Sequence, residues 1–247
     1  MIRLERVAVR RGRGIAADAG PASRSKNPGT DPPIALIGPD GAGKTTILRD
    51  LETRLHRQGK RTRISWMRSP RIFTYGVLGL LRLSGLAKTV RMGDHDDVHT
   101  DLSRHPMLLQ LYAWSITFDY FLGYLAKVSI PRVLLHRTIL LDRFAWDTLV
   151  DLGLASGLGE RFVDLAPGKI LLDVARRHPT MLVTASPDVL IRRKPILSLD
   201  PRLVVRLRLY ETFAHRFGLG MIDSGNTTES VSAGEAAKYF GIPSGGV

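Results

Sequence analysis

The sequence predicts an α/β protein built on a parallel sheet of about five strands with helices on both faces. Short apolar runs, each typical of a strand buried on both sides, alternate along the chain with longer segments of helical periodicity. Alternation of this kind indicates parallel strands, because each helix carries the chain back across the sheet before the next strand begins. The length of 247 residues and the hydrophobic content of 44% are sufficient for a substantial core.

Composition narrows the class of protein further. The chain has no cysteine, which excludes a disulfide framework, a thiolate zinc site and a cysteine nucleophile, and fits a reducing cytoplasmic location. The 36 Lys and Arg residues outnumber the 23 Asp and Glu residues, giving a formal net charge of +13. This excess points to a polyanionic substrate or partner, such as phosphates, nucleic acid or an anionic membrane surface.

Residues 1–32 are predicted to be a basic, disordered tail, and residues 33–247 to form the folded domain. The tail carries seven basic residues against three acidic ones, and Gly, Pro, Ala and Ser dominate its second half. It does not resemble a secretory signal, because no apolar segment follows the basic start.

The first strand is predicted at 34–37, where the chain is apolar without interruption, and the pattern of 45–58 indicates the helix that follows. A second strand is predicted at 62–67. Residues 107–128 form a long apolar segment that predicts a helix, and 137–141 a third strand. The C-terminal half adds strands at 181–184 and 220–223, and helices at 187–193, 201–217 and 231–239.

Two apolar stretches, 73–90 and 107–128, are long enough to be considered as membrane-spanning helices. Arg82, Lys88 and several glycines interrupt the first, and Asp119 lies in the middle of the second. A central carboxylate is costly in a bilayer, so a helix buried in the domain is favoured over a membrane span. Whether either stretch contacts a membrane surface or a partner peripherally is left open.

The strongest motif is Gly38-Pro39-Asp40-Gly41-Ala42-Gly43-Lys44-Thr45, which matches the phosphate-binding loop pattern and lies between a predicted strand and a predicted helix. Glycines let backbone N–H groups surround a phosphate, and the helix N-terminus adds positive potential. Lys44 is expected to reach the β- and γ-phosphates of ATP, and the Thr45 hydroxyl to bind Mg²⁺. The predicted nucleotide-binding residues are Gly38, Asp40, Gly41, Ala42, Gly43, Lys44, Thr45 and Thr46, in a P-loop NTPase fold. The alternative is a glycine-rich turn with an incidental lysine.

A second candidate lies at Asp142-Arg143, where the apolar strand ends in a carboxylate. In phosphate-binding-loop proteins an Asp at this position lies near the metal and the phosphates, so Asp142 and Thr45 are the predicted metal ligands. Arg143 can hold a second phosphate through its guanidinium. The alternative is an Asp that caps the following helix, beside an exposed Arg.

These motifs together resemble the thymidylate kinase family of nucleoside monophosphate kinases. The resemblance extends to Ser186-Pro187-Asp188, to Arg206 and Tyr210 one helical turn apart, and to Met221-Ile222-Asp223. It implies that Asp40 contacts the sugar of the acceptor nucleotide, and that Arg68 grips the acceptor phosphate. It also implies a lid at about 192–200 in which Arg192 and Arg193 neutralise the transferring charge, and a homodimer formed through the helices before the third predicted strand.

Departures from the family pattern concern the acceptor more than the chemistry. Ser69 replaces the usual acid after Arg68, Thr184 replaces the carboxylate common at the end of the fourth strand, and 108–120 contains no Arg. The chain therefore looks more like divergent bacterial thymidylate-kinase-like proteins, whose acceptors differ.

Several other residues are interpreted structurally. Asp147 and Asp151, four residues apart, are expected on a solvated helix face. Trp114, Phe118 and Tyr120 are expected in the core rather than stacked on a base. Arg192 and Arg193 have the alternative of a solvated helix end, and Arg68 that of surface charge. The seven histidines show no metal-ligand spacing.

The expected function is transfer of the ATP γ-phosphoryl group, with Mg²⁺, to a nucleoside monophosphate, with thymidylate as the first choice. Lys44, Asp142, Arg143, Arg192 and Arg193 are the predicted catalytic residues, and Asp40, Arg68 and Arg143 are predicted to bind the phosphorylated acceptor. One alternative is a kinase for another small phosphorylated acceptor, such as a sugar phosphate or a lipid-linked intermediate. The other is a nucleotide- or nucleic-acid-binding protein without turnover, although no nucleic-acid partner is expected.

Overall fold

The computed structural model describes residues 31–67, 72–92 and 95–243. Its centre is a five-stranded sheet with the order β2-β5-β1-β6-β7, in which all neighbouring strands are parallel. The strands are β1 (Ile34–Ile37), β2 (Thr62–Trp66), β5 (Thr138–Asp142), β6 (Thr180–Thr184) and β7 (Gly220–Asp223). The predicted parallel sheet is therefore confirmed, and each predicted strand is found within one residue of its expected bounds.

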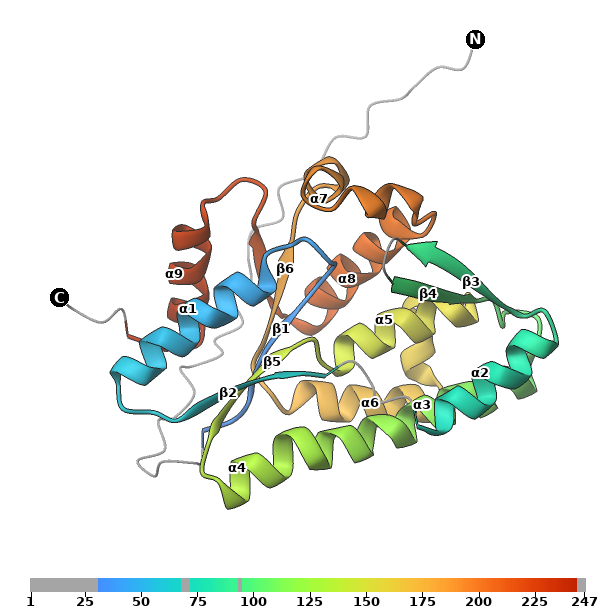
Figure 1. The fold of residues 1–247 in the computed structure, drawn as a ribbon, viewed down its shortest axis with the longest axis horizontal. Coiled ribbons are helices and arrows are strands. Elements are labelled where there is room, and N and C mark those ends of the chain that lie inside the picture. The colour runs from blue at the N-terminus through green and yellow to red at the C-terminus, as the bar shows by residue number, and fades with distance from the viewer. Residues whose placement is uncertain (1–30, 68–71, 93–94, 244–247) are drawn as a thin grey trace, which may run out of the picture.

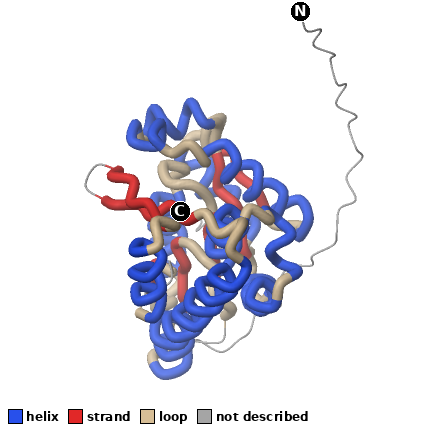
Figure 2. The backbone as a smooth tube through the Cα atoms, turned by 90° about the vertical axis from the view of Figure 1, so that its right-hand side faces the viewer, coloured by secondary structure: helices blue, strands red, loops and turns tan. Residues whose placement is uncertain are grey.

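Helices cover both faces of this sheet, as predicted (Figures 1 and 2). On one face, α1 (Lys44–Arg57) and α9 (Glu229–Tyr239) pack on the strand residues that include Leu36. On the other face, α3 (Pro106–Tyr124), α5 (Ala145–Ser156) and α6 (Ala166–Arg176) pack on those that include Ala35 and Ile37. The helix α8 (Leu203–Phe217) contributes side chains to both cores.

The segment between β2 and β5 contains a hairpin and a π-helical turn that the sequence analysis did not predict. The helix α2 (Phe73–Leu83) packs against α3, and a separate antiparallel hairpin follows it, formed by β3 (Ala87–Met92) and β4 (His95–Thr100). A π-helical turn (Leu125–Ser129) joins α3 to α4 (Ile130–Leu134), so that one nearly continuous helix precedes β5. The apolar stretch 73–90 is thus a helix followed by the start of a hairpin strand.

The remaining elements lie after β5. The 3₁₀ helix Gly159–Asp164 connects α5 to α6. The sequence analysis predicted neither this 3₁₀ helix nor α6. The helix α7 (Pro187–Arg193) has the predicted bounds and is followed by the 3₁₀ helix Pro195–Leu199. The carboxyl ends of the strands point toward the top of Figure 1, where α7 lies.

One prediction about α3 is wrong. The helix is not buried in the domain all round, and two of the three aromatic side chains expected in the core are about half exposed: Trp114 at 45% and Phe118 at 52%, whereas Tyr120 is fully buried. The reason is that α5 and α6 cover only one side of α3, while α2 covers part of another. Within the described ranges, no helix is long and apolar enough to cross a bilayer.

Candidate functional site

The Gly38–Thr45 loop connects the carboxyl end of β1 to the first turn of α1. Gly38 has a φ of 130°, and a Cβ atom at this position would lie 2.1 Å from the carbonyl oxygen of Val183. No other residue fits here without displacing β6, because the loop leaves the sheet pressed against its neighbouring strand. The first N–H groups of α1 have no carbonyl partner inside the helix and face the loop, as at any helix start.

Lys44 lies beneath this loop. Its ammonium donates hydrogen bonds to the carbonyl oxygens of Gly38, at 2.8 Å, and of Pro39, at 2.6 Å. Burial, together with the nearby charge of Arg143, lowers the pKa of Lys44 to about 8. The lysine is therefore held inside the loop by backbone oxygens.

Thr45 and Asp142 meet at the boundary between β5 and α1. The Thr45 hydroxyl donates to an Asp142 carboxylate oxygen at 2.7 Å, because Asp142 ends β5 directly beside Leu36 of β1. In the part of the chain that the structure describes, no group of three or more His, Asp and Glu side chains could hold a metal. A divalent cation here would take two oxygens from the protein and the others from water or phosphate, which is the pattern that Mg²⁺ prefers at phosphate sites.

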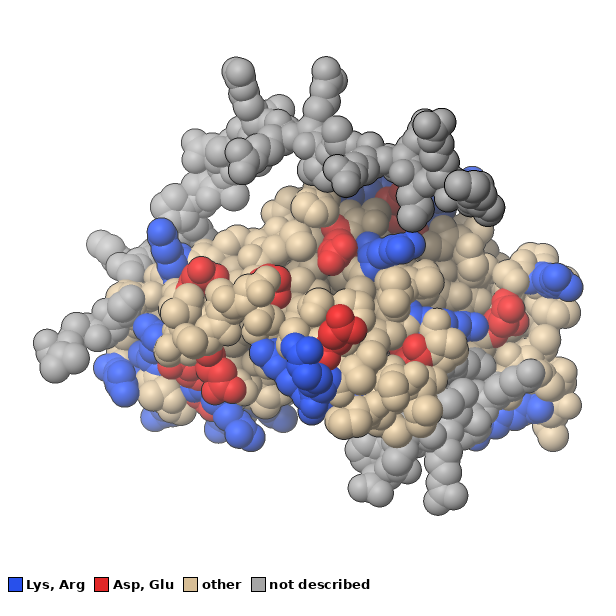
Figure 3. Space-filling model, turned by 90° about the horizontal axis from the view of Figure 1, so that it is seen from above, with Lys and Arg blue, Asp and Glu red and all other residues tan. Residues whose placement is uncertain are grey.

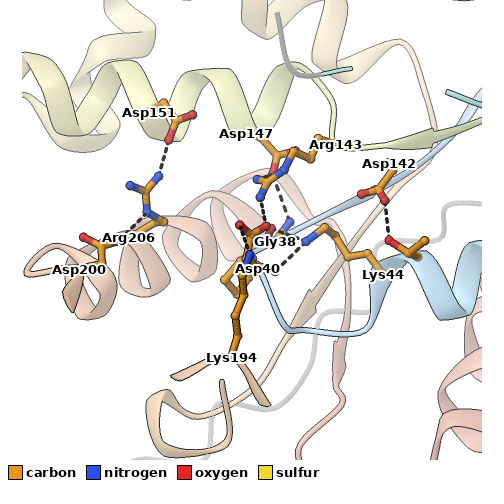
Figure 4. Close-up of polar contacts among 12 residues, drawn as sticks. Gly38, Asp40, Lys44, Asp142, Arg143, Asp147, Asp151, Lys194, Asp200 and Arg206 are labelled. Atoms are coloured by element: carbon orange, nitrogen blue, oxygen red, sulfur yellow. Dashed lines mark hydrogen bonds and ion pairs between the residues drawn. The ribbon is translucent and has the colours of Figure 1, made fainter. Parts of the chain in front are cut away.

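Arg143 follows Asp142 in an unusual backbone conformation, with a φ of 69°. Its N–H donates to the carbonyl oxygen of Leu36 at 3.0 Å, and its guanidinium lies between Asp40 of the loop and Asp147 of α5 (Figure 4). Burial opposes the charge on Arg143, but Asp147, followed by Tyr210 and Asp40, raises its pKa above the ordinary value.

Asp40 therefore sits among cations. Besides Arg143, the ammonium of Lys194 lies 3.3 Å from its carboxylate. Burial acts to raise the pKa of Asp40, but Arg143, Lys44 and Lys194 outweigh it and hold the pKa well below its usual range. The loop thus presents a fixed carboxylate that is already engaged by two basic side chains.

Asp147 corrects a prediction, because it is buried and not on a solvated helix face. Four donors converge on its carboxylate: the Tyr210 hydroxyl at 2.6 Å, the Phe144 N–H at 2.8 Å, and the Gly38 N–H and an Arg143 guanidinium nitrogen, each at 3.3 Å. Phe144 is the N-cap residue of α5, so its N–H is the one that Asp147, in the first turn, satisfies at the start of that helix. Asp147 thereby joins the loop, Arg143 and α8 at one point.

Asp151, one turn further along α5, forms an ion pair with Arg206 of α8, whose Nε lies 3.6 Å from Asp200 (Figure 4). Asp151 is therefore partly buried and paired with a helix of the domain, and the expectation of a solvated face is wrong here too. Arg206 and Tyr210, one helical turn apart, both contact α5.

The predicted lid arginines separate in the structure. Arg193, at the end of α7, donates to the carbonyl oxygen of Gly41 at 3.3 Å, and to the Oγ and carbonyl oxygen of Ser224 at 2.9 and 2.7 Å. Arg192 is exposed and does not line the cavity described next. Arg68 lies outside the described residues, as do residues 1–30 of the predicted tail.

A cavity of about 480 Å³ opens at the carboxyl ends of β1, β2 and β5. Of the predicted site residues, Asp40, Gly41, Ala42, Gly43, Lys44, Thr45, Thr46, Asp142, Arg143 and Arg193 line it. The remaining lining residues are Ile47, Trp66, Ser224, Thr227, Glu229 and Ser232, which the sequence did not single out. Gly38 lies at the base of the loop, where its N–H bonds Asp147.

Comparison with protein-family models finds none that matches this chain, and comparison with curated proteins finds no match either. What is established is an α/β fold with a five-stranded parallel sheet and a polar cavity at the carboxyl ends of its strands.

Proposed function

We propose that the chain is an ATP- and Mg²⁺-dependent phosphotransferase of the thymidylate kinase type, with a P-loop NTPase fold, that acts on a nucleoside monophosphate, thymidylate being the first acceptor to test. One observation carries the proposal: a glycine-rich loop, Lys44, the Thr45–Asp142 pair and Arg143 line the same cavity. These are the groups that phosphoryl transfer requires, since its catalysis consists mainly of positioning and charge neutralisation.

The residues suit a polyphosphate. The Lys44 ammonium is bonded to loop carbonyl oxygens at the place where a β- or γ-phosphate would be cradled, and it can exchange these neutral acceptors for charged ones. Thr45 and Asp142 offer adjacent oxygens to Mg²⁺, which when bound would neutralise phosphate charge and orient the γ-phosphoryl group. Arg193 and Ser224 line the part of the cavity between α7 and the turn after β7, where the remainder of the nucleotide would lie.

Arg143 is the candidate for the second phosphate. Asp147 and Asp40 hold its guanidinium in place before any ligand arrives, so little reorganisation is needed on binding. In the transfer, the bond between the γ-phosphorus and the β,γ-bridging oxygen breaks, and a bond forms to an oxygen of the acceptor phosphate. This oxygen already carries negative charge, so no side chain has to remove a proton from the nucleophile.

The test is ADP release with ATP and Mg²⁺ over a panel of acceptors: the nucleoside monophosphates, several sugar phosphates, a lipid phosphate and no acceptor. We expect acceptor-dependent turnover that falls at least about 100-fold in Lys44→Ala and in Arg143→Ala. Lys169→Ala, which removes an exposed lysine of α6 that does not line the cavity, is the matched control and should keep full activity.

The outcomes separate the alternatives. Turnover with a sugar or lipid phosphate would keep the chemistry and change the acceptor. ATP binding without turnover on any acceptor would contradict the kinase and favour the nucleotide-binding alternative. Full turnover in Arg143→Ala would exclude a role for Arg143 in catalysis or in binding the acceptor phosphate.

A further inference from the structure

Most of the large apolar side chains that are exposed in the described residues lie on one surface, formed by α2, α3, the π-helical turn and α4. This surface, here called the α2–α3–α4 face, comprises the exposed side chains of 72–83 and 107–135. In Figure 1 its helices run along the lower edge of the molecule, with α2 at the right-hand end.

The exposed residues of α3 form a single stripe. It comprises Met107, Leu111, Trp114, Phe118 and Phe121 of α3 and Leu125 of the π-helical turn, and the spacing alternates between four and three residues, which places them on one side of a helix, with exposed Leu122 next to Phe121. The stripe continues beyond the π-helical turn with exposed Ile130 and Val133 on α4. Beside it, Phe73 of α2 packs edge-on against Phe118, with ring centroids 4.9 Å apart, so the helices form one continuous surface.

The charge on this face has one sign. In the segments that form the face, 72–83 and 107–135, the only acidic residue is Asp119, and its buried carboxylate accepts the N–H groups of Phe73 and Thr74, each at 2.9 Å. The same two segments carry the basic residues Arg82, Lys127 and Arg132. Arg104 and Arg137 flank the face, and Arg104 lies near the exposed carboxylate of Asp101. The face seen from above, by contrast, shows acidic and basic side chains close together (Figure 3).

The basic charge and the exposed apolar side chains of this face together indicate which partner it binds. We propose that the α2–α3–α4 face docks on an anionic lipid bilayer, with α3 lying in the plane of the interface. Exposed apolar and aromatic side chains between basic residues are the composition of helices that bind in this way, and Trp and Tyr rings are favoured at the headgroup level. A second copy of the same face would instead bring like charges together, because it offers no exposed carboxylate to pair with them.

The docking face reaches the cavity. Trp66, which lines the cavity and is 52% exposed, accepts a hydrogen bond at its carbonyl oxygen from the Lys127 ammonium at 3.1 Å. The same ammonium lies 5.9 Å from the centre of the Trp66 ring. Docking would therefore bring Trp66, at one margin of the cavity, near the headgroup layer. The docking itself does not depend on the proposed phosphotransfer.

The experiment is flotation of the full-length chain with vesicles of phosphatidylcholine alone or mixed with phosphatidylglycerol. We expect binding to the mixed vesicles, weak binding to the neutral ones, and at least a tenfold loss of affinity between low and high salt. Binding should also shift Trp fluorescence to shorter wavelength, because Trp66 and Trp114 are exposed in the free protein.

Two variants address the face itself. The apolar variant Trp114→Ser/Phe118→Ser and the charge variant Arg82→Glu/Lys127→Glu should each reduce the affinity for mixed vesicles at least tenfold. The matched control Val204→Ser/Val205→Ser removes exposed apolar side chains of α8, away from the face, and should bind as the unaltered chain does. Far-UV circular dichroism establishes that all three variants are folded.

Three results would overturn the proposal. The first is absence of binding to mixed vesicles. The second is unchanged binding of the apolar variant, which would assign the affinity to the basic N-terminal residues. The third is a dimer in solution that Trp114→Glu dissociates and that vesicles do not displace, which would assign the face to a second copy of the chain.

Discussion

At the carboxyl edge of the sheet charged side chains are buried, whereas on the α2–α3–α4 face apolar side chains are exposed. Lys44, Arg143 and Asp147 are each less than a tenth exposed, and each has hydrogen-bond partners fixed by the backbone or by a neighbouring helix. Trp114 and Phe118 are about half exposed. The comparison shows that residue type alone does not decide burial here, because contacts with other elements do.

The largest effect is expected for Asp147→Ala. Removing this carboxylate leaves Arg143 and the Tyr210 hydroxyl buried with fewer partners, so the free energy of unfolding should fall by about 3 kcal/mol. Urea unfolding followed by circular dichroism measures it. The matched control is Asp173→Ala, which breaks an Asp–Arg pair of the same four-residue spacing on α6, with both partners about two thirds exposed. Its effect should stay below about 0.5 kcal/mol, and equal losses in the two variants would contradict the comparison.

The next effect is a dependence on pH that originates at Lys44. Its pKa is about 8 in the folded chain, against an ordinary value of 10.5, so the unfolded chain holds one more proton between these values. The unfavourable contribution of Lys44 to stability is complete below pH 8 and disappears as the pH rises toward 10.5. The free energy of unfolding should therefore increase, relative to Lys44→Met, by up to about 1.4 kcal/mol per pH unit above pH 8. If the difference in free energy of unfolding between the unaltered chain and Lys44→Met stays constant from pH 7 to 9.5, the Lys44 ammonium is not buried.

A smaller effect is expected where α2 begins. Asp119→Ala removes the acceptor of two N–H groups, at Phe73 and Thr74, and should cost about 1–2 kcal/mol. Hydrogen exchange should accelerate first in the amides of α2. Ser115→Ala on the same helix removes only a hydroxyl bonded to the Tyr112 carbonyl oxygen within α3, and should leave α2 protected. Unaltered exchange of α2 in Asp119→Ala would show that packing alone holds this helix.

The smallest effect is expected on the exposed face. Leu111→Gln should change the free energy of unfolding by less than about 0.5 kcal/mol, because the Leu111 side chain is about half exposed. At Leu109, which is buried two residues earlier, the same substitution should cost several times more. Thermal unfolding of Leu111→Gln and Leu109→Gln measures both losses of stability. Equal losses would mean that Leu111 is also covered in solution.

The sheet could be predicted from the sequence because its three central strands, β5, β1 and β6, are largely apolar runs separated by segments of helical periodicity. The meeting of Thr45 with Asp142 was likewise predictable, since parallel strands bring their carboxyl ends to one edge. The role of Asp147 was not predicted, because its four-residue spacing from Asp151 is the same on a solvated and on a buried helix face. A signal was nevertheless present: the helix 145–156 is apolar on nearly all sides, which indicates full burial.

Other omissions have different physical causes. The hairpin has a second strand, His95–Thr100, that contains four His or Asp residues and one Val, so it shows no apolar strand pattern. The helix α6 does carry a usable signal, with Pro167 in its first turn and apolar residues at three- and four-residue spacing. Contacts of Ser224 and Arg193 depend on how α7 and the turn after β7 approach each other, which no local pattern specifies.

The strand order has a consequence for how the chain is made on the ribosome. The first strand that the structure describes, β1, lies in the middle of the sheet, and both of its neighbours come more than 100 residues later. Its backbone groups lack both neighbouring strands of the sheet until β5 has emerged. During that interval an uncovered apolar strand and the apolar segment of α3 are both present on the nascent chain, which is when the chain is most prone to aggregate.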